Sequence, residues 1–243
     1  MSGVVRPTRN NEASPWGVLP SGTFVIVPAY NEARTIGAVL SALTGICTDL
    51  VVVDDGSRDE TPAIARRYAP YVLRHMINRG QGAALQTGIE FALQRGAKII
   101  VTFDADGQHS VRDIDALVQP IAGGECEITL GSRFLGRTMR MPLPRRMMLK
   151  AAILFTQILS QVKLTDTHNG LRAFSRRSAE RIVITNDRMA HASELIDIIR
   201  DLHMPFREVP VKIRYTKYSL AKGQSMRGAT RVLFDYVVGR VTS

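Results

Sequence analysis

Residues 98–109, with the sequence KIIVTFDADGQH, decide how the rest of the chain is interpreted. The first six are mostly apolar, which is typical of a short strand covered on both faces of a sheet. Asp104 and Asp106 follow, two residues apart, and Gly107 favours a turn. Carboxylates at this spacing, at the end of a buried strand, can both reach one hard divalent cation such as Mg²⁺ or Mn²⁺. Gln108 and His109 would add a carbonyl oxygen and an imidazole to the same site.

The chain around this segment alternates between short apolar runs and helical patterns. We expect strands at residues 23–27, 50–53, 71–76, 98–103 and 127–131, with helices between them that end near residues 43, 68, 95 and 121. Ser57 with Glu60 is expected to cap the second of these helices, and Ser110 the fourth. The alternation predicts an α/β fold in which a mostly parallel central sheet has helices on both faces.

Polar residues gather where the expected strands end, at residues 28–32 (PAYNE), 54–57 (DDGS) and 104–106 (DAD). Ligands of such sheets bind beyond the carboxyl ends of the strands, so the functional site is expected there. Asp54 and Asp55 can accept hydrogen bonds from the base or ribose of a nucleotide. Residues 78–82, NRGQG, resemble a phosphate-binding glycine loop. They lack the full dinucleotide fingerprint and the Gly-Lys-Ser/Thr of a P-loop, which disfavours a dehydrogenase or a P-loop ATPase.

The charge of the chain is divided unevenly. Residues 1–127 hold 11 Lys and Arg against 14 Asp and Glu, whereas residues 128–243 hold 21 against 8. Between Glu127 and Asp166 there is no acidic residue, but there are seven basic ones: Arg133, Arg137, Arg140, Arg145, Arg146, Lys150 and Lys163. This half therefore favours an anionic partner, such as a phosphate or an anionic membrane surface. Few aromatic residues are interleaved with the basic ones, which disfavours nucleic acid.

The second half of the chain is less regular. Residues 145–162 form a helical pattern with a wide apolar face, which is typical either of a buried helix or of one lying in a membrane interface. A helix is expected at residues 192–202, a strand at 206–215 and a last helix at 227–240. We divide the chain into a flexible leader (residues 1–21), one catalytic domain (22–226) and a C-terminal helix (227–243) that faces a membrane or a partner.

The composition indicates where in the cell the protein is expected to act. The longest apolar runs are about five residues, far short of the roughly 18 that span a bilayer, so no transmembrane helix is expected. The first twenty residues lack the apolar core of a secretory signal. Cys47 and Cys126 form neither a disulfide framework nor a metal-binding pattern, and are expected to be buried thiols in a reduced cytoplasm.

Taken together, the motifs carry a more specific resemblance than any one of them does. Residues 28–32, 53–57, 78–88, 104–109 and 131–133 occur in this order, and the chain resembles glycosyltransferase family 2 with its A-type nucleotide-sugar fold. Within that family it is most similar to the polyprenyl-phosphate glycosyltransferases, such as the dolichyl-phosphate mannose synthases. Residues 166–174 match the segment that follows the core in that branch, and residues 222–225 loosely resemble a later element.

The resemblance implies a role for each matching residue. A nucleotide sugar, linked to UDP or GDP, would be held by Pro28, Tyr30, Glu32, Asp55 and Asp104. The metal, Mg²⁺ or Mn²⁺, would be held by Asp104, Asp106 and Gln108. Arg133, together with Arg145 or Arg146, would grip an acceptor phosphate. Asp106, Arg133 and Asp166 would be the catalytic residues, and transfer would invert the anomeric carbon.

The expected activity is transfer of a sugar to a polyprenyl phosphate at the cytoplasmic face of a membrane, with the protein bound peripherally. An anionic membrane surface or a small membrane protein would hold it there. A lipid phosphate is ionised near pH 7 and needs no general base, whereas a saccharide hydroxyl needs one. For that alternative Asp166 is the candidate base, with His168 second. A non-catalytic nucleotide-sugar-binding subunit is the further alternative, and Glu194 is expected only to open a helix.

Overall fold

The computed structural model describes only part of the chain. The described residues are 18–139, 162–167, 169–187 and 191–215, with Leu143, Arg146, Met147, Leu149, Lys150, Ile153 and Gln157. Arg145, His168, residues 222–225 and the expected last helix lie outside them. Of the expected leader, residues 18–21 are described, and Leu19 is buried and donates its N–H to the Ile46 carbonyl at 3.0 Å.

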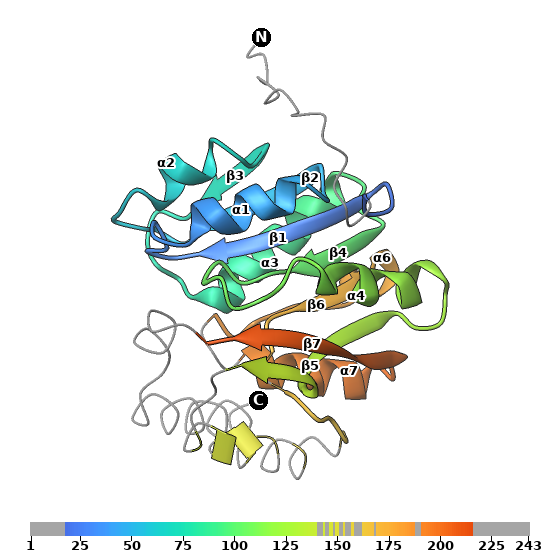
Figure 1. Ribbon diagram of the computed structural model, residues 1–243. Coiled ribbons are helices and arrows are strands. Elements are labelled where there is room, and N and C mark those ends of the chain that lie inside the picture. Colours follow the sequence, from blue (N-terminus) through green and yellow to red (C-terminus); the bar gives the residue numbers. More distant parts are fainter. Residues whose placement is uncertain are drawn as a thin grey trace.

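A central seven-stranded sheet organises the described part of the chain (Figure 1). The strands follow the order β3-β2-β1-β4-β6-β5-β7. All pairs are parallel except those of β6, which runs antiparallel to both β4 and β5. The predicted mostly parallel sheet is therefore confirmed. The strands are β1 (Thr23–Ala29), β2 (Asp49–Asp54), β3 (Tyr71–Arg74), β4 (Ile99–Thr102), β5 (Ile128–Met139), β6 (Arg172–Ser175) and β7 (Phe206–Arg214).

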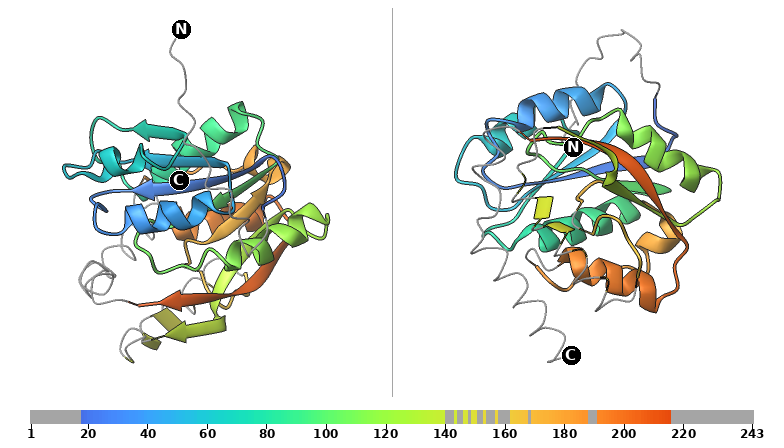
Figure 2. Two further views of the ribbon diagram at one scale, coloured as in Figure 1. Left: turned by 45° about the horizontal axis from the view of Figure 1, so that its top comes forward. Right: turned by 60° about the horizontal axis from the view of Figure 1, so that its bottom comes forward.

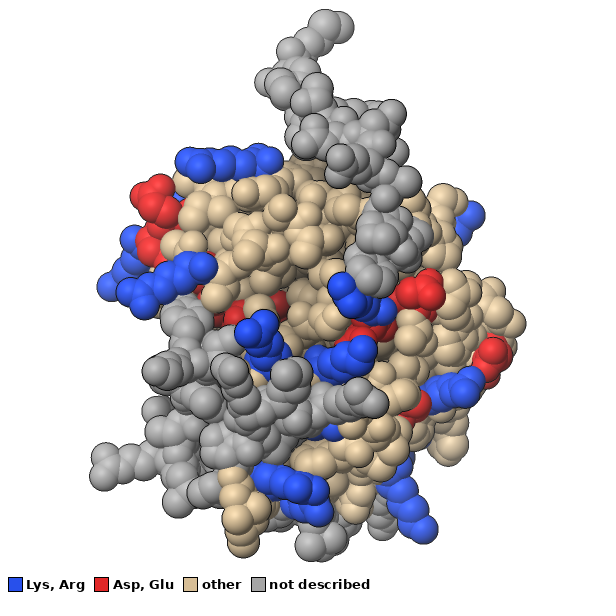
Figure 3. Space-filling view, in the orientation of Figure 1, with Lys and Arg blue, Asp and Glu red and all other residues tan. Residues whose placement is uncertain are grey.

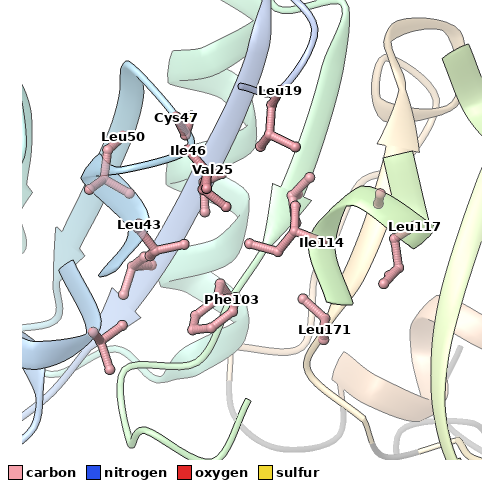
Figure 4. Close-up of a cluster of buried hydrophobic side chains, with 14 of the residues drawn as sticks. Leu19, Val25, Leu43, Ile46, Cys47, Leu50, Phe103, Ile114, Leu117 and Leu171 are labelled. Atoms are coloured by element: carbon pink, nitrogen blue, oxygen red, sulfur yellow. The ribbon is translucent and has the colours of Figure 1, made fainter. Parts of the chain in front are cut away.

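Helices cover both faces of the sheet, as expected (Figures 1 and 2). One face packs against α1 (Ile36–Thr44), α2 (Thr61–Ala65) and α4 (Asp113–Ala122). The other packs against α3 (Gln81–Gln94), α6 (Arg176–Ala179) and α7 (His191–Asp201). Figure 4 shows the first of these two cores, in which Leu43 of α1 and Ile114 of α4 approach Val25 and Phe103. Both expected thiols, Cys47 and Cys126, are free and buried.

Three expectations about local structure are wrong. β6 was not expected, because its four residues, RAFS, contain no β-branched side chain and no alternation that marks a strand. Ser57 does not cap α2: its hydroxyl accepts the Asn31 N–H at 2.9 Å, and α2 begins at Thr61 with a proline in its first turn. Ser110 does not cap α4, which begins three residues later without a side-chain cap.

Pro28 marks the point where the sheet opens. The β1–β2 pairs continue to Ala29 and Asp54, but the β1–β4 pairs end at Ile26 and Thr102, two residues before Pro28. A proline inside a central strand would normally remove a ladder hydrogen bond. Here its missing N–H lies beyond the β1–β4 ladder, so none is lost. The two strands diverge at their carboxyl ends, where the aspartates follow.

Candidate functional site

Asp104 lies two residues after the end of β4 and is held from two sides. Its Oδ1 atom accepts a hydrogen bond from Gln81 Nε2 at 2.9 Å, and its Oδ2 atom lies 3.0 Å from His109 Nε2. Burial alone would raise the pKa of Asp104. The hydrogen bond and charge of His109, with the charge of Arg172, outweigh burial and hold this pKa below its ordinary value. The carboxylate is therefore both ionised and fixed in place.

Gly170 allows a distant segment to pass against Asp104. The Gly170 carbonyl accepts a hydrogen bond from Thr102 Oγ1 at 2.7 Å. A Cβ atom added to Gly170 would lie only 2.1 Å from Asp104 Oδ2. Glycine is thus required for this approach, and the segment 166–174, which carries part of the family resemblance, is brought to the end of β4.

Asp106 faces a different environment. The Gln108 backbone N–H and Nε2 donate to its two oxygens at 2.9 and 2.6 Å. Burial, with the charges of Asp104 and Glu32, raises the pKa of Asp106 to about 6, although Gln108 and His109 oppose this. A divalent cation would relieve this crowding of carboxylates, so the donor set fits Mg²⁺ or Mn²⁺. Across the described ranges, no three His, Cys, Asp or Glu side chains are grouped to hold a metal by themselves.

The segment after β1 lies against the segment after β2. Asn31 adopts a left-handed conformation (φ 53°), and its Oδ1 atom accepts the Arg58 N–H at 2.9 Å. Glu32 is buried; its N–H donates to Thr61 Oγ1 at 2.7 Å. Tyr30 is more than one third exposed, and Pro28 is buried. The structure thus brings these predicted nucleotide contacts to the sheet edge that also carries Asp104.

Asp55 is buried and has several partners within the protein. Its carboxylate accepts hydrogen bonds from the Arg79 and Gly80 N–H groups at 2.9 and 2.7 Å, and lies 2.7 Å from His75 Nδ1. His75 Nε2 in turn lies 3.0 Å from Thr87 Oγ1. Asp55 therefore positions the glycine-containing turn before α3, and its contact with a nucleotide stays a prediction. Nothing in the sequence around His75 pointed to this role.

Arg133 lies on an irregular part of β5. The β5–β7 pairing shifts between Ser132 and Arg137, so the four residues 133–136 of β5 lie opposite one residue of β7, Val211. Gly136 packs against the β7 backbone, since a Cβ atom there would lie 2.0 Å from the Val211 carbonyl oxygen. Bulges of this kind redirect side chains next to functional sites. Here the bulge turns Arg133 into the protein, where it is 8% exposed.

Two side chains of the described part of the chain hold the Arg133 side chain. Its Nε atom donates to Asp166 Oδ2 at 2.6 Å and its Nη1 atom to the Tyr215 hydroxyl at 2.9 Å. Burial lowers the pKa of Arg133, but Asp166 and Tyr215 outweigh burial and raise it above its ordinary value. Asp166, predicted as a catalytic residue, is thus the ion-pair partner of the predicted phosphate ligand.

Arg172 is a site residue that sequence reasoning missed. It begins β6 and is paired in the sheet with Thr102, two residues before Asp104. It is buried, and its Nη2 atom donates to the Thr167 carbonyl at 3.3 Å. Burial lowers the pKa of Arg172 to about 10, although the charges of Asp104 and Asp166 oppose this. The signal in the sequence for Arg172 was its position within residues 166–174, the segment that matches the polyprenyl-phosphate branch of the family.

Of the other two acceptor candidates, Arg146 is among the described residues. Arg146 is exposed, and no described contact links it to Arg133. Arg145 and the second candidate base, His168, lie outside the described residues.

Glu194 does more than open α7: its carboxylate accepts the N–H groups of Thr185 and Asn186 at 2.9 and 3.0 Å.

The fold and the site together define a class of enzyme. A parallel sheet that opens between β1 and β4, with carboxylates at the opening, is the arrangement of a glycosyltransferase of the A-type fold, which uses nucleotide-sugar donors. Residues 24–183 match the model of the glycosyl transferase family 2. The chain therefore belongs to glycosyltransferase family 2, as its motifs indicated.

Relatives of known name agree with this assignment. The chain is 32% identical to a UDP-N-acetylglucosamine–dolichyl-phosphate N-acetylglucosaminyltransferase of Methanococcus voltae, over 87% of this chain and 93% of that protein. It is 30% identical to a polyprenol monophosphomannose synthase of Mycolicibacterium smegmatis, over 82% of this chain and 78% of that protein.

A solved structure shows the same fold. Glucosyl-3-phosphoglycerate synthase from Mycobacterium tuberculosis, in complex with Mn²⁺, UDP-glucose and phosphoglyceric acid, matches with a TM-score of 0.70. The match covers 90% of this chain and 78% of that one at 18% identity.

Proposed function

We propose that this protein transfers a sugar, with inversion, from a nucleotide-diphosphate sugar to a polyprenyl phosphate, with Mg²⁺ or Mn²⁺ as cofactor. The relatives named above support this acceptor class, because two of them act by name on dolichyl or polyprenol phosphate. The observation that carries the proposal is the pairing of Asp166 with Arg133. A hydroxyl acceptor needs a base, and the described candidate is buried against a guanidinium, whereas a phosphate acceptor needs only cations.

On the donor side, Asp104, Asp106 and Gln108 would hold the metal. When bound, the metal supplies a Lewis acid for the charge of the departing diphosphate. His109 keeps Asp104 ionised, and His109 and Gln81 orient its carboxylate. The two hydrogen bonds from Gln108 fix Asp106. Pro28, Tyr30 and Glu32 would contact the nucleotide, with Asp55 shaping the turn opposite them.

On the acceptor side, Arg133 would orient the phosphate. A planar guanidinium can donate to two phosphate oxygens at once, which fixes the direction of attack. In-line attack on the anomeric carbon depends on such positioning and proceeds with inversion. Arg145 or Arg146 would supply the second cation, and Arg172 offsets the charge of the carboxylates beneath the site.

A surface of mixed apolar and basic character supports binding at the cytoplasmic face of an anionic membrane, directly or through a small membrane protein. Between residues 143 and 157 the described residues are helical; Leu149 and Ile153 are buried, whereas Met147, Arg146 and Lys150 are exposed. Such a helix can insert apolar groups while its cations meet lipid phosphates. On the face drawn in Figure 3, several Lys and Arg side chains lie near the centre, with acidic side chains among them. Among the described residues, no helix has the length and apolarity needed to cross a bilayer.

The test is a transfer panel. The protein is incubated with each common nucleotide sugar, Mg²⁺ or Mn²⁺, and a short polyprenyl phosphate, and release of nucleoside diphosphate is measured. We expect release that requires both lipid and metal and that is lost in Asp106→Ala but kept in Asp115→Ala, which changes an exposed aspartate of α4. Release without lipid, or only with a saccharide, would instead favour the hydroxyl acceptor and Asp166 as base. Flotation with anionic vesicles tests the membrane surface.

A further inference from the structure

Tyr215 ends the described part of the chain in an unusual position for a tyrosine. The side chains of β7 alternate, with Val209, Val211 and Ile213 buried, and Tyr215 continues this alternation one residue past the strand. It is 1% exposed and is among the largest fully buried side chains. A buried tyrosine hydroxyl normally requires a hydrogen-bond partner. For Tyr215 that partner is Arg133 Nη1, at 2.9 Å.

The bond from Tyr215 completes the orientation of the guanidinium. Asp166 holds the Nε atom at 2.6 Å, and the Tyr215 hydroxyl holds Nη1 at 2.9 Å. A single hydrogen bond constrains the rotation of a planar group about the bonded atom less than two bonds do. Two bonds to different nitrogens fix both the plane and the rotation of the guanidinium.

The end of β7 also contacts the loop after β4, which carries Asp104 and Asp106 and is called the carboxylate loop below. The Arg214 N–H donates to the Gln108 carbonyl at 3.0 Å, and Ile213 forms a bridge with His109. His109 is the residue that lies 3.0 Å from Asp104. Three consecutive residues, 213–215, therefore contact both the carboxylate loop and the arginine on which the acceptor is proposed to bind.

We propose that Tyr215 is a positioning residue for sugar transfer: through its hydroxyl it fixes Arg133 at a set distance and angle from the carboxylates. This proposal rests on the proposed function, because it assigns Arg133 to the acceptor phosphate. Tyr215 touches no reacting atom and acts through Arg133. Since catalysis by alignment is sensitive to displacements of about 1 Å, a rotated guanidinium would lower transfer without disturbing the donor.

The test compares Tyr215→Phe with Tyr68→Phe, which removes a hydroxyl from a tyrosine packed against the same core but remote from the site. For each variant we would measure transfer to a short polyprenyl phosphate, metal-dependent donor hydrolysis by water, nucleoside diphosphate binding and the melting temperature. We expect Tyr215→Phe to lower kcat/KM for the lipid by about tenfold to a hundredfold. Donor hydrolysis and nucleotide binding should match those of Tyr68→Phe. The melting temperature should fall by several degrees, because the buried Arg133 loses a hydrogen-bond partner.

Two results would overturn the proposal. The first is unchanged lipid transfer, or a parallel loss of nucleotide binding and transfer, in Tyr215→Phe. The second comes from the Arg133→Lys background, where the tyrosine change should have no further effect; additive losses would mean that Tyr215 does not act through Arg133. A wild-type protein that transfers nothing to lipid while hydrolysing the donor would instead refute the proposed acceptor, and this inference with it.

Discussion

Replacing Gly170 with alanine should damage the site far more than the fold. The new Cβ atom would lie 2.1 Å from Asp104 Oδ2, whereas ordinary contact begins at 3.4 Å, so one group must move by about 1.3 Å. The Gly170 carbonyl is held by Thr102, which leaves the carboxylate to move away from Gln81 and His109. A misplacement of about 1 Å can cost roughly a hundredfold in rate, and overpacking costs about 1–3 kcal/mol of stability.

The assay for Gly170→Ala combines metal-dependent release of nucleoside diphosphate with urea unfolding. The control is Gly37→Ala in α1, where a Cβ atom would meet Ile64 at 3.4 Å. That substitution should keep wild-type activity and raise the unfolding free energy by about 0.5–1 kcal/mol, because alanine favours a helix. If Gly170→Ala keeps wild-type activity and metal dependence, the carboxylate does not need its observed position, and the reasoning is refuted.

Three further predictions concern Asp166 with Arg133, Cys47 and Glu194. Asp166→Asn or Arg133→Met should each lower the unfolding free energy by about 3–5 kcal/mol, because each removes one partner of a buried ion pair. Urea unfolding should show a smaller loss in the double variant Arg133→Met/Asp166→Leu, and a purely additive loss would contradict the pairing. Burial raises the pKa of the Cys47 thiol from 9.0 to about 12. Between these two pH values the thiol ionises in the unfolded chain but not in the folded protein. The contribution of buried Cys47 to stability is therefore complete below pH 9 and is lost as the pH rises towards 12. Native protein at pH 8 should therefore react with iodoacetamide at Cys47 only as it unfolds, and rapid labelling in the folded state would be inconsistent with this. Glu194→Gln should weaken the bonds to Thr185 and Asn186 and lower the melting temperature by several degrees in calorimetry, with no change expected in an exposed control such as Glu90→Gln.

The first half of the fold was predictable because its signals are local. β1, β2 and β4 are apolar runs without alternation, and the polar residues at their ends mark the site edge from the sequence alone. β6 was not predictable, because a four-residue strand in the middle of the sheet is defined by its neighbours rather than by its own residues. In the same way, no local pattern around Arg172 or Tyr215 indicates that each is buried beside a charged partner.

The sequence indicated which residues gather at the candidate site better than it indicated which groups those residues contact. The aspartates at the end of β4 do lie together with Gln108, as their spacing required. Asp55, by contrast, was assigned to the nucleotide and Asp166 to catalysis, and the structure gives both of them strong partners within the protein. A carboxylate in a sequence does not reveal whether a guanidinium or a backbone N–H will reach it, because these partners come from segments far along the chain.

The place of β6 also sets the order in which the sheet can form. β3, β2, β1 and β4 pair within residues 23–102, but β4 gains its other neighbour only when residues 172–175 arrive. During synthesis, which proceeds at about 5–20 residues per second, the backbone edge of β4 stays open for several seconds. Such an edge can pair with another chain. A newly made chain is therefore most exposed to aggregation in this interval, and because Gly170 and Arg172 arrive with β6, closing that edge and completing the site are one folding event.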